Sequence, residues 1–184
     1  MYVASLNYPA GKASYPFSVA TGRTNLVNEL NSLAEQCRYP AFFLAGFSQG
    51  ASVVLESLLK WNNQGAAPNL SAKAKNAIRA VVAFGDPNFA VKQAFNAPGA
   101  PTDRGGRLGQ RNSNSNAELA SYRYWGWPPG GSGQGWVYKI RSYCYPGDAF
   151  CNTANDPNYT IHNSYGKKST MDARRWMEDM VNSF

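Results

Sequence analysis

The sequence predicts an α/β fold built on a mainly parallel sheet. Short apolar runs alternate with segments that have the period of an amphipathic helix, as in repeated strand–helix units. Residues with reactive or ionisable groups follow directly on three of these runs: Ser48, Asp86 and Asp148. Because sites in parallel sheets lie beyond the carboxyl ends of the strands, we expect the three side chains at one edge of the sheet.

The runs that predict strands are short and largely apolar. The run AFFLAG at 41–46 is continuous, which is typical of a parallel strand covered on both faces. The strands predicted in this way are 2–6, 41–46, 78–85 and 136–143.

The segments between these runs predict helices, each with one apolar stripe. In the first helix, apolar residues recur three and four positions apart from Leu26 to Cys37. The final helix has the same spacing from Ala173 onward, with Ser169 as its expected N-cap. The helices predicted in this way are 18–37, 49–60, 70–77 and one that begins at Ser169.

Residues 88–135 interrupt the alternation. The stretch is rich in Gly, Pro, Asn and aromatic residues and has no sustained period. Irregular stretches of this length are usually functional or disordered, and the aromatic density argues against disorder. We interpret it as a lid or substrate wall beside the site, with packing filler as the alternative. Its aromatic residues are expected to line an apolar groove leading to Ser48, chiefly Tyr122, Tyr124, Trp125, Trp127 and Trp136, with Trp125 and Trp127 taken as substrate-binding.

Composition places limits on the class of protein. A chain of 184 residues predicts one domain over 1–184, and 43% hydrophobic and 14% aromatic residues exclude disorder. No apolar run approaches the length of a membrane helix, and residues 1–12 lack the pattern of a signal peptide. The net charge of +7 comes from scattered Lys and Arg without a nucleic-acid motif. It indicates either attraction to an anionic cell envelope or a merely basic surface.

The pentapeptide GFSQG at 46–50 places a serine between two glycines behind a predicted strand. It is either a tight turn or a nucleophile on a strand-to-helix corner. A serine nucleophile needs a base, and the only histidine in the chain is His162. Without Ser48, His162 would be read as an ordinary surface residue.

Two aspartates are candidates to orient the histidine. Asp86 and Asp148 each follow a predicted strand and lie between the serine and the histidine in chain order. We favour Asp148, because it lies in the segment CYPGDAFC, which a bond between Cys144 and Cys151 could hold rigid. Two ordinary buried thiols, or zinc binding with Asp148 and His162, are the alternatives. Zinc is the weakest, since no metal-ligand spacing occurs, and we expect no metal or cofactor.

Three separated motifs resemble those of cutinases. They are CRYPAFFLAGFSQGAS around Ser48, CYPGDAFC around Asp148 and HNSYG at His162. The resemblance implies an α/β-hydrolase three-layer sandwich with Ser48, Asp148 and His162 as catalytic triad. It also implies a Cys144–Cys151 disulfide and the backbone N–H of Gln49 as an oxyanion donor.

The N-terminus departs from the cutinase pattern. We expect no counterpart here of the family's first strand, which carries its second oxyanion donor and the cysteine that pairs with the equivalent of Cys37. Cys37 is therefore expected to be a free, largely buried thiol. The second donor is expected from the loop at 7–14, or is absent.

The segment between the predicted strands at 78–85 and 136–143 is longer than in compact cutinases. In this it is similar to the lysin B enzymes of phages, which cleave mycolyl esters and have extra structure at this place. Together the resemblances imply a monomeric serine esterase, secreted or phage-delivered, that acts on lipid or glycolipid esters of an actinobacterial envelope. The alternatives are a catalytically weak module that binds envelope glycolipid, and acyl transfer by the same triad.

Overall fold

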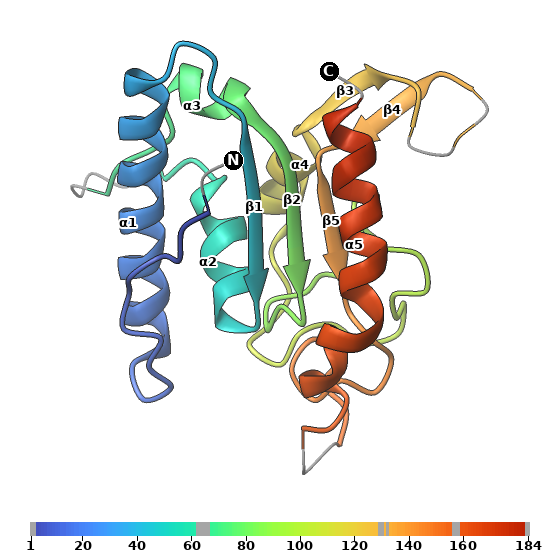
Figure 1. Cartoon of the computed structure of the whole chain (residues 1–184). Coiled ribbons are helices and arrows are strands. Elements are labelled where there is room, and N and C mark those ends of the chain that lie inside the picture. The colour runs from blue at the N-terminus through green and yellow to red at the C-terminus, as the bar shows by residue number, and fades with distance from the viewer. Residues whose placement is uncertain (1–2, 62–66, 129–130, 132, 156–158, 183–184) are drawn as a thin grey trace.

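A parallel sheet with helices on both faces forms the centre of the computed structural model (Figure 1). The structure describes residues 3–61, 67–128, 131, 133–155 and 159–182. The sheet contains β1 (Phe42–Phe47), β2 (Ile78–Phe84) and β5 (Ile140–Tyr143), in the order β1-β2-β5, and all neighbours run parallel. This confirms the predicted fold class.

The strands of this sheet end level with one another. Phe47 at the end of β1 is paired with Phe84 of β2, and Phe84 is paired with Tyr143 of β5. The residues that follow the strands therefore emerge at one edge, as the sequence predicted. β2 lies between the other two strands, and its Val- and Ala-rich sequence is almost wholly buried.

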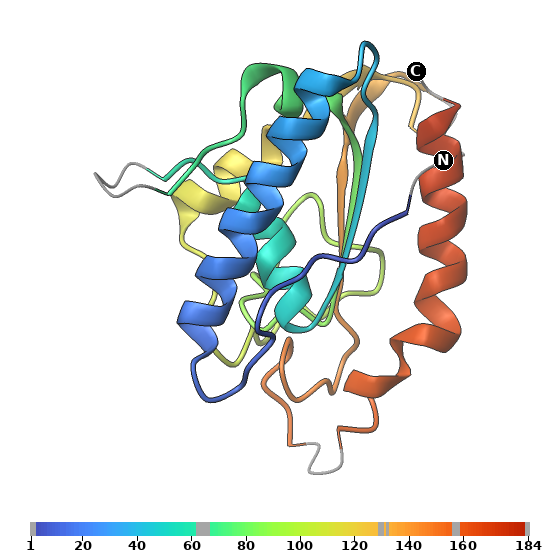
Figure 2. The ribbon, with the colours of Figure 1, turned by 60° about the vertical axis from the view of Figure 1, so that its left-hand side comes forward.

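Helices cover the two faces of the sheet and form the outer layers of the sandwich. Figure 2 shows α1 and α2 on one face and α5 on the other. The first face holds a core of Leu, Val and Ala side chains around Val53, Leu55 and Val81, and the α5 face holds a second core around Val82, Trp176 and Met180. The helices are α1 (Tyr15–Gln36), α2 (Gln49–Ser57), α3 (Ala72–Ala77), α4 (Ser113–Ala120) and α5 (Tyr165–Val181).

β1 is not covered on both faces, which corrects the prediction for the run at 41–46. Its side chains alternate between half-buried and exposed, and Phe43 and Phe47 are 37% and 46% exposed. α5 packs mainly against β2, and the outward side chains of β1 remain partly open to solvent. The apolar run therefore reflects one covered face and one open apolar face.

The predicted strand at 2–6 is also wrong for the residues that the structure describes. Residues 3–6 are irregular and mostly exposed, with Val3 78% exposed. Among the described residues the sheet starts at β1, and the N-terminal segment is not paired with it. A short apolar run forms a strand only when a neighbour accepts its hydrogen bonds, and this segment packs on α1 and α2 instead, with Leu6 and Tyr8 against that core.

The last predicted strand is two strands. β4 (Gly135–Tyr138) pairs antiparallel with β3 (Arg123–Gly126), whereas β5 joins the main sheet. The break falls at Lys139, whose ammonium group donates to the Ile78 carbonyl. At the other end of the chain, α5 begins at Tyr165, one turn before the predicted N-cap. The Ser169 hydroxyl donates back to the Tyr165 carbonyl inside that helix.

None of the described helices is both long enough and apolar enough to cross a membrane.

Candidate active site

Ser48 occupies a strained corner between β1 and α2. Its φ of 53° and ψ of −119° lie in a region that non-glycine residues rarely adopt, and its N–H donates to the Phe84 carbonyl (2.8 Å). A Cβ at Gly46 would lie 2.2 Å from the Gly50 carbonyl oxygen, so the backbones approach too closely for a side chain. The geometry is that of a nucleophile corner rather than an ordinary turn.

His162 lies beside Ser48, in the short 3-10 helix that precedes α5. Its Nε2 is 2.9 Å from the Ser48 Oγ, and its ring is almost fully buried. The chain also makes room for the ring at Gly85, directly after β2. A Cβ at this position, which has φ of +61°, would lie 2.9 Å from the His162 Cε1.

Asp148 completes the hydrogen-bonded line behind the histidine. Its Oδ2 is 2.9 Å from the His162 Nδ1, and its Oδ1 accepts the backbone N–H groups of Phe150 (2.6 Å) and Cys151 (3.1 Å). Burial by itself would raise the pKa of the carboxyl. The hydrogen bonds from His162 and the two N–H groups outweigh burial and hold that pKa below its ordinary value. Asp148 is therefore a charged group that can orient an imidazole and stabilise its protonated form.

The loop that carries Asp148 is closed by a disulfide between Cys144 and Cys151. This bond removes the zinc alternative, because neither sulfur is available as a thiolate ligand. Cys37 is free but exposed, whereas the sequence predicted a largely buried thiol. It lies at the end of α1, beyond the last buried position of that helix, Ala34.

The sequence of the chain matches a known protein family. A sequence profile of the cutinase family matches residues 1–181, almost the whole chain. The chain belongs to the cutinase family. Among curated members, acetylxylan esterase 2 of Talaromyces purpureogenus is 30% identical over 176 residues, which cover 89% of this chain and 66% of that protein. Cutinase 11 of Verticillium dahliae is 26% identical over 94% of this chain and 53% of that protein.

Solved structures show the same fold. The catalytic core domain of acetyl xylan esterase from Trichoderma reesei is 25% identical, with a TM-score of 0.69 over 98% of this chain and 82% of that one. Lysin B from Mycobacteriophage D29 is 25% identical, with a TM-score of 0.53 over 88% of this chain and 57% of that one. The chain thus spans between about half and two thirds of the length of the curated relatives that it matches over most of its own length.

In this cutinase-family chain, Gln49 is the first residue of α2. The first N–H groups of a helix have no acceptor within the helix, so the Gln49 N–H is available to a negative oxygen beside Ser48. The Gln49 side chain accepts from the Ser18 hydroxyl (2.8 Å) and donates to the Gly11 carbonyl (3.1 Å). These bonds bring the loop at 7–14, which was expected to supply the second donor if there is one, beside the start of α2.

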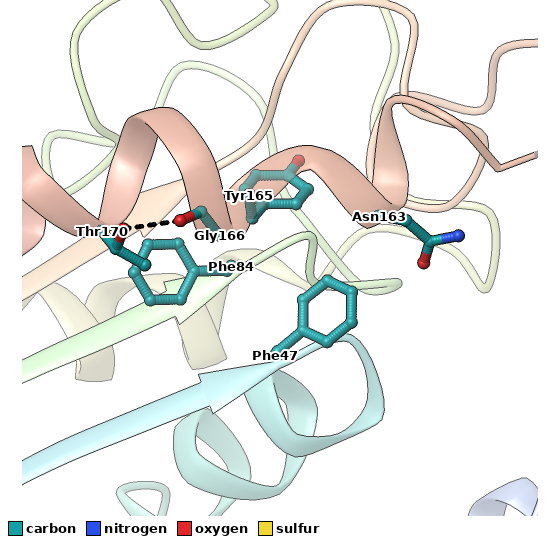
Figure 3. Close-up of a pocket in the computed structure, with 6 residues that line it drawn as sticks. All are labelled: Phe47, Phe84, Asn163, Tyr165, Gly166 and Thr170. Carbon is teal, nitrogen blue, oxygen red and sulfur yellow. Dashed lines mark hydrogen bonds between the residues drawn. The ribbon is translucent and has the colours of Figure 1, made fainter.

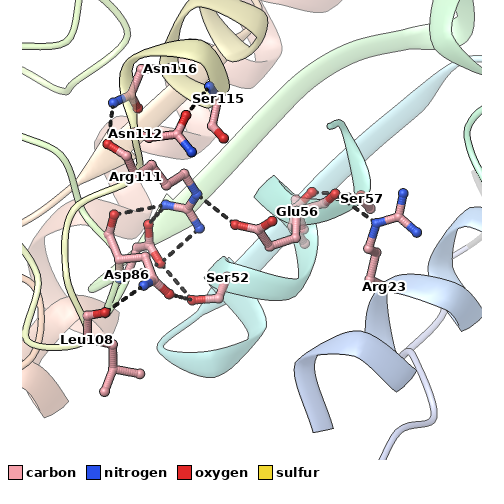
Figure 4. A network of polar contacts seen from close by, with 12 residues as sticks. Arg23, Ser52, Glu56, Ser57, Asp86, Leu108, Arg111, Asn112, Ser115 and Asn116 are labelled. Atoms are coloured by element: carbon pink, nitrogen blue, oxygen red, sulfur yellow. Dashed lines mark hydrogen bonds and ion pairs between the residues drawn. The ribbon is translucent and has the colours of Figure 1, made fainter. Parts of the chain in front are cut away.

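Asp86, the other candidate acid, is held by a different set of contacts. It is fully buried, forms an ion pair with Arg111 and accepts from the Ser52 hydroxyl (2.8 Å) and the Asn88 N–H (3.1 Å). Figure 4 shows this network, in which Arg111 also reaches Glu56 of α2 (3.0 Å). Asp86 therefore ties the stretch at 88–135, called the insert from here on, to α2, and the structure supports the choice of Asp148.

Two residues of this region were not predicted from the sequence. One is Arg111, which shows in the sequence only as one of several scattered cations. The other is Tyr165, whose hydroxyl donates to the Asp148 Oδ2 (2.8 Å). Tyr165 is the tyrosine of the HNSYG motif, and its place in that motif was the sequence signal that could have identified it.

The expected substrate wall of tryptophans is wrong. Trp125 lies in β3 and Trp127 directly follows that strand, within the β3–β4 hairpin. The hairpin lies at the end of the sheet opposite to the corner between β1 and α2 (Figure 1). Both rings are exposed, and Trp125 packs edge-to-face on Trp136, its cross-strand partner, with 5.5 Å between ring centroids. Tyr122 is buried in the α1–α2 core, where its hydroxyl donates to the Leu58 carbonyl (2.7 Å). The chain reverses through the hairpin before β5 begins, which carries these aromatics away from the site.

Other parts of the insert do reach the edge that holds Ser48. The Arg107 N–H donates to the Phe150 carbonyl (2.7 Å), and the Asn152 side chain donates to the Arg104 carbonyl (2.9 Å). Phe89 packs against the disulfide. This half of the insert supports the Asp148 loop, so packing describes it better than a lid does.

Proposed function

We propose that the chain is a carboxylic ester hydrolase that works through an acyl-enzyme. One observation carries the proposal: an unbroken hydrogen-bonded line joins Ser48, His162 and Asp148, with 2.9 Å at each step to the histidine. Family membership supports it.

The geometry assigns a role to each group. Ser48 Oγ attacks the ester carbon while its proton passes to the His162 Nε2, and the Gln49 N–H binds the oxygen that becomes negative. The carbon–oxygen bond to the alcohol then breaks, and His162 returns the proton to the departing oxygen. Water attacks the acyl-Ser48 carbon in the second half. It gives one proton to His162, which passes it to the Ser48 Oγ as the acid leaves.

The proposed substrate is a lipid ester, with mycolic-acid esters of an actinobacterial envelope as the specific form. The fold shared with lysin B from Mycobacteriophage D29 and the net charge of +7, which favours an anionic surface, support this form. A second candidate is the removal of acetyl groups from a polysaccharide. The 30% identity to acetylxylan esterase 2 favours it.

We further propose that the protein acts outside the cytosol, by secretion or phage delivery. The Cys144–Cys151 disulfide supports an oxidising compartment, since such bonds are rare where glutathione keeps thiols reduced.

Hydrolysis of p-nitrophenyl acetate and butyrate tests the proposal. We expect turnover with a burst of nitrophenol from the unmodified chain, and loss of both in Ser48→Ala, with an unchanged unfolding midpoint. Ser113→Ala, at an exposed serine of α4, is the matched control and should behave as the unmodified chain. A folded chain that hydrolyses no ester but binds envelope glycolipid would instead support the binding-module alternative.

A further inference from the structure

Three of the chain's five tryptophans are exposed on the β3–β4 hairpin. Trp125, Trp127 and Trp136 are 60%, 58% and 52% exposed. The inner face of the hairpin is apolar and covered: Val137 is buried and, with Tyr124, packs in the core under α5. The inner face therefore accounts for the packing of the hairpin, and the three indole rings lie outside both cores of the sheet.

A cation accompanies these rings. Arg123 and Trp125 are two apart in β3 and share a face, and Trp136 is the cross-strand partner of Trp125. The Arg123 guanidinium lies over the Trp136 ring, 4.2 Å from its centroid, while Trp125 meets the same ring edge-to-face. Positive charge and apolar surface are thus presented side by side. The hairpin face, as we call it, consists of Arg123, Trp125, Trp127 and Trp136.

The end of the sheet that carries the hairpin is basic. α3 lies at the same end (Figure 1). The Lys75 ammonium of α3 lies 4.8 Å from the ring centroid of Tyr122, which directly precedes Arg123. Burial and the nearby charge of Arg79 lower the pKa of Lys139. The segments 70–79 and 119–139 contain no Asp or Glu, and their cations are Lys73, Lys75, Arg79, Arg123 and Lys139.

Acidic residues of α5 offset only part of this charge. The last turns of α5 reach the same end and carry Glu178 and Asp179 (Figure 1). Glu178 is paired with Arg174, one turn earlier (2.7 Å). Five cations of the two segments stand against these two acids, so this end remains positively charged.

Phe47, the exposed aromatic residue next to Ser48 in the chain, has a different setting. It lines an apolar cavity of about 270 Å³ between α5 and the ends of β1 and β2 (Figure 3). The six residues of the lining carry no charge: Phe47, Phe84, Asn163, Tyr165, Gly166 and Thr170. Exposed rings are therefore combined with cations at the hairpin end and not in this cavity.

We propose that the hairpin face anchors the protein to the surface of an anionic lipid bilayer. Such a surface has negative charge on the outside and acyl chains beneath. Indole rings are favoured at this boundary, and each Lys or Arg near it adds attraction. The proposal does not depend on the esterase function, because the hairpin and the corner that carries Ser48 lie at opposite ends of the sheet (Figure 1).

A neutral polysaccharide fits the hairpin face less well. Sugar rings stack on indole rings, but their hydroxyl groups also need hydrogen-bond partners when they lose water. The four residues of the hairpin face provide no carboxylate or amide side chain for this purpose. The positive charge of this end of the sheet also gains nothing from a neutral polymer.

Attachment through the hairpin face turns the candidate triad away from the lipid. Ser48 then faces solvent or a layer above the bilayer, and esters within that bilayer lie out of its reach. The bound protein should therefore hydrolyse a soluble ester as the free protein does.

Vesicle binding tests the anchor in the Ser48→Ala chain, which cannot turn over an ester. Co-sedimentation is measured with vesicles of phosphatidylcholine alone and with vesicles that contain equal parts of phosphatidylcholine and phosphatidylglycerol. We expect binding only to the anionic vesicles, with a blue shift of tryptophan fluorescence as the indole rings leave water. Added salt should weaken this binding, because it screens the charges.

Variants of the hairpin face locate the contact. Replacing Trp125 and Trp127 together by Ser should weaken binding at least about tenfold, the effect of one buried aromatic side chain. Arg123→Gln should weaken it about fivefold. Phe17→Ser is the matched control: Phe17 is 68% exposed in the first turn of α1, at the end of the molecule that carries Ser48 (Figure 1). It should bind as the parent does, and all variants should keep the unfolding midpoint.

Several results would overturn the anchor. They are no binding to anionic vesicles, unchanged binding in the folded tryptophan variant, and an equal loss in Phe17→Ser. Binding to insoluble xylan that the tryptophan variant loses, without vesicle binding, would assign the face to a polysaccharide. A dimer that the same variant dissociates would assign it to a second copy of the chain.

Activity on vesicles separates the anchor from the proposed function. The unmodified chain bound to anionic vesicles should hydrolyse p-nitrophenyl butyrate with unchanged kcat/KM. Inhibition by vesicles that persists in the tryptophan variant would place the lipid at the triad end and overturn the anchor. A chain that hydrolyses no ester but binds vesicles through the hairpin face supports the anchor and contradicts the proposed function.

Discussion

The two glycines that flank Ser48 have different surroundings. A Cβ at Gly46 would lie 2.2 Å from a backbone oxygen, whereas at Gly50 the nearest atom is the Tyr8 hydroxyl, at 3.8 Å. In the symmetrical pattern Gly-x-Ser-x-Gly, only Gly46 is therefore required by the close approach of the backbones, and the position of Gly50 has room for a side chain.

Alanine at the two positions should therefore have opposite effects. We expect Gly46→Ala to lower the unfolding midpoint sharply and to abolish esterase activity, because β1 and α2 must separate. Gly50→Ala should be neutral or add up to about 1 kcal/mol of stability, since alanine is the better helix residue. Thermal unfolding of both variants checks this, and a stable Gly46→Ala protein would contradict the close approach.

Tyr165 holds the acid of the triad in place. Its hydroxyl accepts the Tyr145 N–H (2.9 Å), which leaves its proton directed at the Asp148 Oδ2. Burial and the charge of Asp148 raise the pKa of this hydroxyl, so it remains a donor throughout the working range. The residue acts on the reaction through Asp148 and is a positioning residue.

Tyr165→Phe should lower kcat by about ten- to a hundredfold with little change in KM, the usual value of a hydrogen bond to a charged group. Loss of this donor also raises the pKa of the Asp148 carboxyl, because the bond favours the charged form. The carboxylate is then lost earlier as pH falls, so the acid limb of kcat/KM should move to higher pH. Tyr145→Phe is the control, since only the backbone of Tyr145 contacts the hydroxyl. An equal loss of kcat/KM at every pH, with no shift of the acid limb, would indicate that Tyr165 has a merely structural role.

At the scale of elements, the loop 144–151 owes its shape to covalent and long-range bonds. The disulfide closes it, and the N–H of Arg107 and the side chain of Asn152 join it to the insert. Asp148 is therefore fixed by two segments that lie far apart in the chain.

Thiol counting and reduction test this loop. The unreduced protein should show one reactive thiol, Cys37, in the folded state as well as in urea, because that thiol is exposed. Alkylation of Cys37 should leave activity unchanged. Reduction of the disulfide should lower stability by about 2–4 kcal/mol and reduce kcat as Asp148 loses its support. Three reactive thiols before reduction would contradict the disulfide.

At the scale of the whole molecule, the buried cation of Arg111 joins three segments that lie far apart in the sequence. Arg111 comes from the insert, Asp86 from the end of β2 and Glu56 from α2, and the Arg111 side chain is 5% exposed (Figure 4). The pair of Arg111 with Asp86 is buried, so removal of one partner leaves a charge without compensation.

Arg111→Met should therefore destabilise the protein by about 3–5 kcal/mol in urea unfolding. Arg104→Ala is the matched control. The pair of Arg104 with Asp103 is exposed and should be worth less than about 1 kcal/mol. Equal effects of the two changes would show that the insert is not held by the buried network.

The sequence by itself determined the strand–helix alternation and the order Ser48–Asp148–His162, and its resemblance to cutinases implied the pairing of Cys144 with Cys151. These features are encoded locally: helix and strand periods repeat within a few residues, and the motifs keep fixed spacings. Ser48 and Asp148 follow directly on strands whose ends are level, so the sheet needs little more than its parallel register to bring them together.

The tertiary structure alone decided what surrounds that site. No local pattern distinguishes an aromatic that packs in the core, such as Tyr122, from one exposed at the far end of the sheet, such as Trp125. The turn of the β3–β4 hairpin made that difference. The partners of Arg111 and the cavity beside Phe47 likewise depend on residues far apart in the chain. Which segment covers a face is settled by packing across the whole fold, and here α5 packs mainly against β2 and leaves the outward side chains of β1 partly open to solvent.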